Sequence, residues 1–185
     1  MSVTIRFPAV VLTLLLLFNS SALADSKENA ELAGNIVLAL LPATALGKAL
    51  YEDDLEGGWQ YTESIATTMA ATQILKYSID AERPNGADNH SFPSGHTSAA
   101  FSTASFVQMR YGWAYGAPAY LAAAFVGWSR VYSDNHYTRD VVAGAAIGVV
   151  SSYIFTDAYT NEVAVTPIAE NGVYGLKVSS RFSTF

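Results

Sequence analysis

Five apolar stretches divide the chain and predict helices. They run over Ala30 to Tyr51, Glu63 to Ile79, His96 to Arg110, Pro118 to Arg130 and Thr138 to Asp157. Shorter runs of polar and turn-forming residues separate them. The pattern predicts an all-α fold, a compact helical bundle of about five helices with short connections.

The chain changes character after the last of these stretches. Val163 to Ile168 and Gly172 to Phe182 have an extended pattern, and Asn171-Gly172 is a strong signal for a hairpin turn. We therefore expect residues 161–185 to add a small C-terminal β-hairpin to a helical domain over residues 25–160.

The N-terminus has the pattern of an export signal. A basic Arg6 precedes an apolar run from Val10 to Phe18, and Ala22-Leu23-Ala24 provides a small-residue cleavage site. Residues 1–24 are therefore predicted to be a secretory signal peptide. An uncleaved anchor is the alternative, but the apolar run is short for a span of about 20 residues.

The length of the helical stretches also indicates whether the protein spans a membrane. None offers about 20 uninterrupted apolar residues, because residues such as Lys48, Gln73 and Gln108 interrupt or end them. Small residues, as in the run from Ala143 to Gly148, allow close helix packing in soluble and membrane bundles alike. The prediction is an exported protein, periplasmic or membrane-associated and facing the periplasm, with a membrane surface as one candidate partner.

Charge and cysteine content narrow the partners further. The formal net charge is -6, and removal of residues 1–24 takes it to -7, because Arg6 leaves and no acid does. So acidic a chain is not expected to bind nucleic acid, and it repels phosphate weakly unless cations gather in a local pocket. The chain has no cysteine, so its stability must come from the core.

Three separated cations could form such a pocket. Lys76, Arg83 and Arg130 together match a group with two negative charges, since arginine forks bond two oxygens at once and lysine adds a point charge. Lys76 taken alone is more typical of a solvated helix residue than of a ligand.

Histidines beside these cations add reactivity. His136 and Asp140 are spaced i to i+4, so the carboxylate can accept a proton from one ring nitrogen and leave the other free to attack. Ser94, Gly95 and His96 are expected to begin a helix, with Ser94 as its cap and Gly95 allowing an anion close to the backbone. A protonated His96 would stand beside a bound phosphate and give its proton to the departing alkoxide.

These residues resemble a known family, the type 2 phosphatidic acid phosphatases, whose superfamily includes bacterial class A acid phosphatases and vanadium-dependent haloperoxidases. The resemblance covers Lys76 to Asp140. It rests on KYSIDAERP from Lys76 to Pro84, PSGH from Pro93 to His96, and SRVYSDNHYTRD from Ser129 to Asp140. No defining position departs from the family pattern, and so long an ordered motif is far more specific than a lone glycine motif.

The resemblance implies a metal-independent phosphatase that hydrolyses a phosphate monoester or a lipid or isoprenoid (di)phosphate. It implies that His136 becomes a phosphohistidine, that Asp140 orients it, and that His96 is the general acid. The phosphate-binding residues would be Lys76, Arg83, Ser94, Gly95 and Arg130. No metal and no cofactor are implied, and vanadate would act as an inhibitor.

Two alternatives remain open at this point. A vanadium-dependent haloperoxidase would hold vanadate as its cofactor with the same cations, although members of that branch are typically longer chains. A non-catalytic phosphate or phospholipid binding module would bind without turnover, which leaves His96, His136 and Asp140 without a role. For the phosphatase, the expected partner is a phosphorylated small molecule or a lipid substrate.

Two further polar segments are predicted to be connections between helices. The run from Ile79 to Phe92 is expected to be a loop over the site, with His90 as an ordinary loop residue. The acidic cluster of Glu52, Asp53, Asp54 and Glu56 is expected to be a solvated connection between the first two helices.

Overall fold

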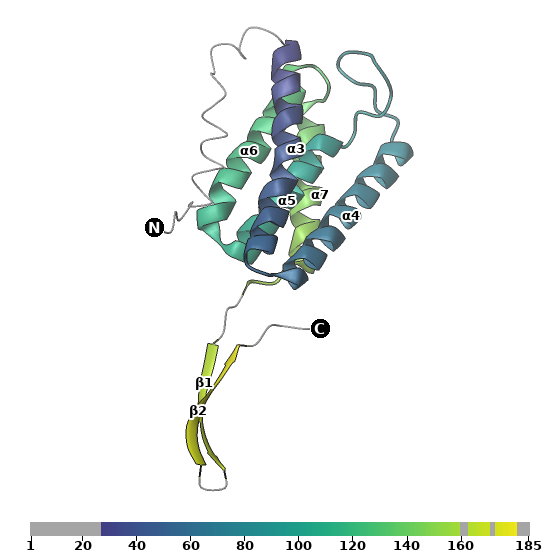
Figure 1. Ribbon diagram of the computed structural model, residues 1–185. Coiled ribbons are helices and arrows are strands. Elements are labelled where there is room, and N and C mark those ends of the chain that lie inside the picture. Colours follow the sequence, from purple (N-terminus) through teal and green to yellow (C-terminus); the bar gives the residue numbers. More distant parts are fainter. Residues whose placement is uncertain (1–26, 160–162, 171–172, 181–185) are drawn as a thin grey trace.

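The computed structural model describes residues 27–159, 163–170 and 173–180, and residues 27–159 form five helices with no strand among them. The helices are α3 (Lys27–Tyr51), α4 (Leu55–Ser78), α5 (Gly95–Tyr111), α6 (Trp113–Tyr132) and α7 (Thr138–Phe155) (Figure 1). The prediction of an all-α bundle with five helices is confirmed for this part of the chain. The predicted signal peptide over residues 1–24 lies outside the described residues.

Two helices, α4 and α6, begin at least five residues earlier than the apolar pattern predicted. Helix α4 starts at Leu55 rather than Glu63, because the Asp54 carboxylate accepts a hydrogen bond from the Gly57 amide over 2.9 Å and caps the first turn. Helix α6 starts at Trp113 and contains Pro118 in its second turn. Gly112, with a φ of 85°, makes the sharp turn between α5 and α6 that a side chain would strain.

Helix α5 lies at the centre of the bundle, between the other helices (Figure 1). The buried cluster around it includes Phe106, Leu41 and Val126. On its other side α7 approaches closely: a Cβ on Gly144 would lie 2.5 Å from the Ser94 carbonyl oxygen. Such backbone-to-backbone contact fixes the start of α5 against the start of α7, and that is where the candidate site residues lie.

The prediction of a solvated acidic cluster is wrong at Asp54. Its side chain is buried and forms a two-pronged ion pair with Arg110, over 2.5 Å from Nη2 and 2.9 Å from Nε. The Tyr111 hydroxyl donates to the same carboxylate over 2.8 Å. Arg110 also donates to the Asp157 carbonyl, over 3.0 Å, which ties the segment after α7 to this end of the bundle. An aspartate that caps a helix end packed inside the bundle requires a cationic partner, and Arg110 provides it.

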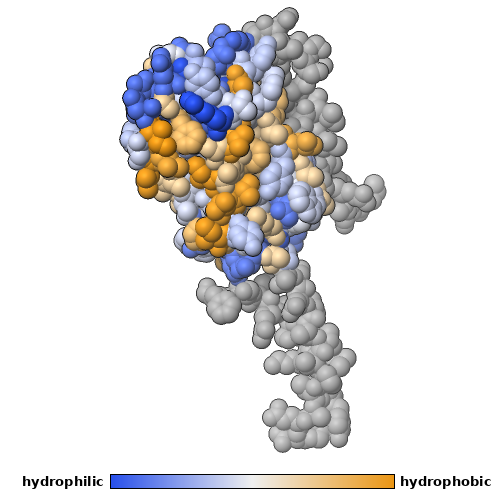
Figure 2. Space-filling model, turned by 180° about the vertical axis from the view of Figure 1, so that it is seen from behind, coloured by the Kyte–Doolittle hydropathy of each residue, from blue (hydrophilic) through white to orange (hydrophobic). Residues whose placement is uncertain are grey.

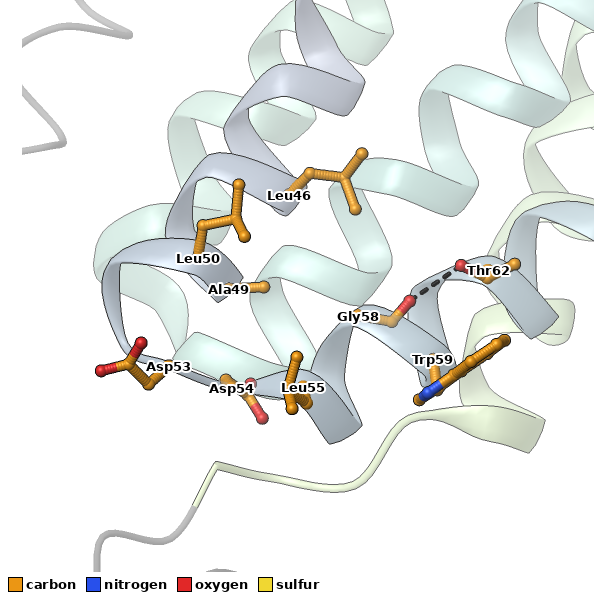
Figure 3. Close-up of a pocket in the computed structure, with 9 residues that line it drawn as sticks. All are labelled: Leu46, Ala49, Leu50, Asp53, Asp54, Leu55, Gly58, Trp59 and Thr62. Carbon is orange, nitrogen blue, oxygen red and sulfur yellow. Dashed lines mark hydrogen bonds between the residues drawn. The ribbon is translucent and has the colours of Figure 1, made fainter.

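The same end of the bundle carries an apolar pocket of about 550 Å³ between the end of α3 and the start of α4 (Figure 3). The residues that line it include Leu46, Leu50, Leu55 and Trp59. More broadly, apolar side chains gather over the middle of one face, with hydrophilic residues above them (Figure 2). The helices therefore present apolar surface to the outside as well as to the core.

Two strands follow the helices, β1 (Val163–Glu170) and β2 (Val173–Ser180). They pair antiparallel, with Val163 opposite Ser180 and Glu170 opposite Val173. The predicted Asn171-Gly172 turn lies outside the described residues. A hairpin appendage over residues 161–185 and the domain boundaries at residues 24 and 160 stay predictions.

Candidate active site

The residues singled out in the sequence lie at helix ends and in two loops. Lys76 is in the last turn of α4 and Arg130 in the last turn of α6. Ser94 precedes α5, Gly95 and His96 begin it, and Asp140 lies in the first turn of α7. Arg83 belongs to the loop before α5 and His136 to the loop before α7.

His136 and Asp140 approach each other through a third residue. Nδ1 of His136 is 3.7 Å from Oδ2 of Asp140, which is too long for a good hydrogen bond. The Ser91 hydroxyl donates to that Oδ2 over 2.5 Å and lies 3.5 Å from Nδ1. His136 does not share a helix face with Asp140 as the spacing suggested, because α7 begins only at Thr138. The loop bends His136 back over the helix start instead.

Ser91 was not predicted from the sequence to be a site residue. It is fully buried, yet it stands in a polar loop without charge or periodicity to distinguish it. The backbone explains its position: the Ser91 amide donates to the Ala81 carbonyl over 2.9 Å, and the Ala81 amide donates to Asn89 over 3.0 Å. These bonds fold the loop back on itself and bring Ser91 beside the imidazole of His136.

Asp140 is fixed by the backbone around it. Its Oδ2 also accepts from the Tyr137 amide over 3.0 Å, which closes a capping box at the start of α7. Its carbonyl accepts from the Ser94 amide over 3.0 Å and so links the starts of α7 and α5. Oδ1 is buried without a hydrogen bond. The Arg139 guanidinium comes within 3.5 Å of it, a charge contact without hydrogen-bond geometry.

The opposite ring nitrogen of His136 faces a cation. Nε2 lies 3.3 Å from Nη1 of Arg83. Since a guanidinium only donates, Nε2 must present its lone pair there, which assigns the ring proton to Nδ1, on the side of Ser91 and Asp140. Burial and the charges of Arg83 and Lys76 lower the pKa of His136 from 6.5 to about 4. The imidazole is therefore neutral near pH 7, with the lone pair of Nε2 directed at Arg83.

Arg83 is itself held by the two loops. Its Nε donates to Asp88 over 2.8 Å within its own loop, and Nη1 donates to the Asn135 carbonyl over 3.0 Å. Lys76 is anchored similarly, donating to the carbonyls of His90 over 2.6 Å and Pro93 over 2.9 Å. Both cations are thus fixed toward the start of α5.

The start of α5 differs in detail from the prediction. Ser94 occupies the cap position, but its hydroxyl bonds the Thr97 hydroxyl over 3.0 Å rather than a backbone amide. A Cβ on Gly95 would meet only Thr72, at an ordinary 3.8 Å. Packing therefore does not require a glycine there, and the missing side chain leaves the backbone accessible to a ligand.

His96 lies where two opposing charges act on it. Burial and then the Arg130 charge lower the pKa of His96 from 6.5 to about 4, while Glu31 acts in the opposite direction. Without a bound anion its imidazole is neutral near pH 7.

The side-chain hydrogen bonds of Arg130 lead away from the other site residues, although its carbonyl accepts from the His136 amide over 3.1 Å. Its guanidinium bonds Ser129 on its own helix and Glu31 and Asn35 on α3. It is almost completely buried, at 2% exposed. His90, by contrast, is exposed, with its ring against Tyr77, as expected for a loop residue.

Metal ligands do not gather in the part of the chain that the structure describes. No group of three or more His, Cys, Asp or Glu side chains there could hold a metal ion. The arrangement is instead two cations, Arg83 and Lys76, that act on the neutral His136 and a third, Arg130, that acts on His96. Such an arrangement suits an anion with several oxygens.

Comparison with known proteins gives the family. Residues 57–164 match the model of the PAP2 superfamily, which is more than half of the chain. The chain belongs to this superfamily, and the resemblance noted from its motifs is confirmed. The match extends beyond the stretch from Lys76 to Asp140 in both directions.

Individual relatives are similar over parts of their length. The lipid A 1-phosphatase of Porphyromonas gingivalis is 34% identical over 116 residues, which is 56% of this chain and 26% of that protein. The lipid A 4'-phosphatase of Helicobacter pylori is 38% identical over 79 residues, 43% of this chain and 40% of that one. The chain thus spans less than half the length of these two curated relatives.

Solved structures include the crystal structure of Aquifex aeolicus LpxE. Superposition of this chain on that structure gives a TM-score of 0.45 at 22% identity and covers 69% of this chain and 92% of that chain.

Proposed function

We propose that the protein is a metal-independent phosphatase that hydrolyses a lipid phosphate through a phosphohistidine on His136. One observation carries the proposal: Nε2 of the neutral His136 presents its lone pair beside Arg83, while Nδ1 is turned toward Asp140. A histidine nucleophile requires one unprotonated ring nitrogen and a second one that is stabilised as positive charge develops.

The first step forms one bond and breaks one. Nε2 of His136 attacks phosphorus, the bond to the leaving oxygen breaks, and His96 gives that oxygen a proton. Positive charge on the imidazole is stabilised by Asp140 through the Nδ1 proton. In the second step water gives a proton to His96 and attacks phosphorus, which breaks the phosphorus–nitrogen bond and releases phosphate.

His96 must be protonated for this role, although its pKa is about 4 in the site without a ligand. A phosphate brings two negative charges beside the ring, and opposite charge favours the protonated form. Binding of the substrate thus supplies the proton donor, and the acid is charged only when there is a leaving group to protonate.

Lys76, Arg83 and Arg130 are proposed to hold the phosphoryl oxygens, with the Ser94 hydroxyl and the Gly95 amide. Cations on these oxygens stabilise charge in the transition state, as magnesium does in other phosphoryl-transfer enzymes. We accordingly propose no metal and no cofactor.

We place the protein in the membrane, exported and with the site facing the periplasm. Helices α3 and α7 are long and apolar enough to span, and only 33% and 28% of their apolar stretches are buried. Apolar side chains such as Leu50, Val150 and Ile154 are exposed on them, as lipid contact would favour. The two histidines and the three cations of the site lie outside these two helices, whereas Asp140 lies in the first turn of α7. The names of the relatives, lipid A phosphatases, favour a phosphorylated lipid as the substrate.

Phosphate release by purified protein in EDTA tests this proposal. The substrates would be a soluble aryl phosphate, phosphatidic acid, undecaprenyl diphosphate and a lipid A phosphate, with His136→Ala as the inactive control. We expect metal-independent release that favours the lipids and is lost in the variant. Release by His136→Ala at the wild-type rate would contradict the phosphohistidine, and preference for the soluble ester would contradict the lipid substrate.

A further inference from the structure

Arg130 is bound on nearly all sides by polar atoms. Nη1 donates to Oδ1 of Asn35 over 3.1 Å, and Nη2 donates to the Glu31 carbonyl over 2.7 Å. Nε and Nη2 each donate to the Ser129 hydroxyl over 3.1 Å. A guanidinium has five N–H groups, and these contacts engage four of them. The fifth is on Nη1, with the Glu31 carboxylate 3.7 Å away.

Helix α3 reaches Arg130 because it carries a glycine at the contact. A Cβ on Gly34 would lie 2.1 Å from the Ser129 hydroxyl oxygen and 2.7 Å from Nη2 of Arg130. No side chain fits there unless the two helices separate. Gly34 therefore sets the distance at which the Asn35 amide can meet the guanidinium.

We propose that α3 is part of the phosphate site and that Asn35 is a positioning residue, which acts through Arg130. This inference rests on the proposed role of Arg130 in binding phosphate. Asn35 lies outside residues 57–164, the segment that matches the family, so the motif itself does not contain it.

The physical reason is the burial of the guanidinium. Asn35 fixes the plane of the guanidinium and leaves one Nη1 proton to donate to a phosphoryl oxygen. Without the Asn35 amide, Nη1 has a second unpaired proton in a buried position, which is costly. The side chain then turns to satisfy it, and the remaining donor no longer points at the ligand.

Binding of inorganic orthophosphate by the full chain in detergent tests the inference without requiring turnover. We expect Asn35→Ala to weaken phosphate binding about tenfold, which corresponds to about 1.4 kcal/mol for one charge-assisted hydrogen bond. Asn35 is exposed, and Ile36→Ala, at the next exposed position of the same helix, is the matched control and should bind as the wild type does. In turnover, KM should rise more than kcat falls.

A double-mutant cycle with Arg130→Lys separates an effect of Asn35 on the position of Arg130 from an effect on protein stability alone. If Asn35 acts through Arg130, Asn35→Ala should weaken phosphate binding far less in the Arg130→Lys protein than in the wild type. Equal losses in both backgrounds would overturn the inference. So would an Asn35→Ala protein that melts earlier but binds phosphate normally, or one that binds phosphate more tightly.

Gly34→Ala provides a second route, should Asn35→Ala not fold. It leaves the Asn35 amide intact but pushes α3 away from Arg130, and it should weaken phosphate binding in the same direction; unchanged affinity would overturn the inference. A wild type that binds orthophosphate but releases none from any ester would contradict only the proposed function. A wild type that binds no orthophosphate would contradict both.

Discussion

The Ser91 hydroxyl donates to the Asp140 carboxylate over 2.5 Å, and both side chains are fully buried. The same hydroxyl lies 3.5 Å from Nδ1 of His136, whose direct distance to the Asp140 carboxylate is 3.7 Å. Asp140 therefore orients the imidazole of His136 through the Ser91 hydroxyl as well as through its own charge. Ser91 belongs to the loop before α5, so the geometry of that loop determines how well the histidine is oriented.

Replacement of Ser91 by alanine tests this relationship. Asp140 would keep the Tyr137 amide as a donor to Oδ2 but lose the hydroxyl, so we expect a loss of about 1–3 kcal/mol in the free energy of unfolding. We expect turnover to fall about tenfold, because the imidazole loses a fixed neighbour. Denaturant unfolding and initial rates would measure both. Ser78→Ala, at an exposed serine, is the control, and a Ser91→Ala protein with the wild-type rate would exclude an orienting role.

Much of this site followed from sequence because its residues are constrained locally. Lys76 and Arg130 lie at the ends of helices that apolar stretches predict, and His96 follows a recognisable helix start. The family motif fixes their order along the chain, and helix ends that meet at one end of a bundle bring them together.

The parts that were missed depend on contacts between distant segments. Asp54 looked like a solvated acid because its partner, Arg110, is 56 residues away. Asn35 meets Arg130 across 95 residues, and only the packing of α3 on α6 reveals it. Neither contact leaves a periodic or compositional trace in the sequence, since each involves a single residue of either segment.

Acid pH should destabilise the fold through His136. Its pKa is about 4 in the folded protein and near 6.5 when unfolded. Between these values the unfolded chain binds more protons, so stability is fully present above about pH 6.5 and is lost as the pH falls toward 4. Unfolding measured across this window should show a weaker pH dependence in His136→Ala. His90→Ala, which removes an exposed ring, should keep the wild-type slope; equal slopes in all three proteins would contradict burial of a neutral His136.

The Asp54 and Arg110 pair should matter for stability and not for chemistry. Asp54→Asn leaves the buried guanidinium without its counter-charge, and we expect a loss of about 3–5 kcal/mol in the free energy of unfolding. The pair lies at the far end of α5 from His96, so turnover per folded molecule should stay unchanged. Asp53→Asn, at the exposed neighbouring position, should shift stability by no more than about 0.5 kcal/mol. Similar losses in both variants would show that the buried pair has no special role.

The role of His96 is best tested by the leaving group. An alkoxide, as released from a lipid phosphate, needs a proton in order to depart, whereas an activated aryl oxide departs as a stable anion. We therefore expect His96→Ala to lower turnover of a lipid phosphate by about 10²-fold or more and that of an aryl phosphate much less. Initial rates of the two substrates, compared in wild type and variant, give the ratio directly. His90→Ala serves as the histidine control and should change neither rate. Equal losses on both substrates would assign His96 to phosphate binding instead, and the proton for the leaving group would then have to come from water or from another residue of the site.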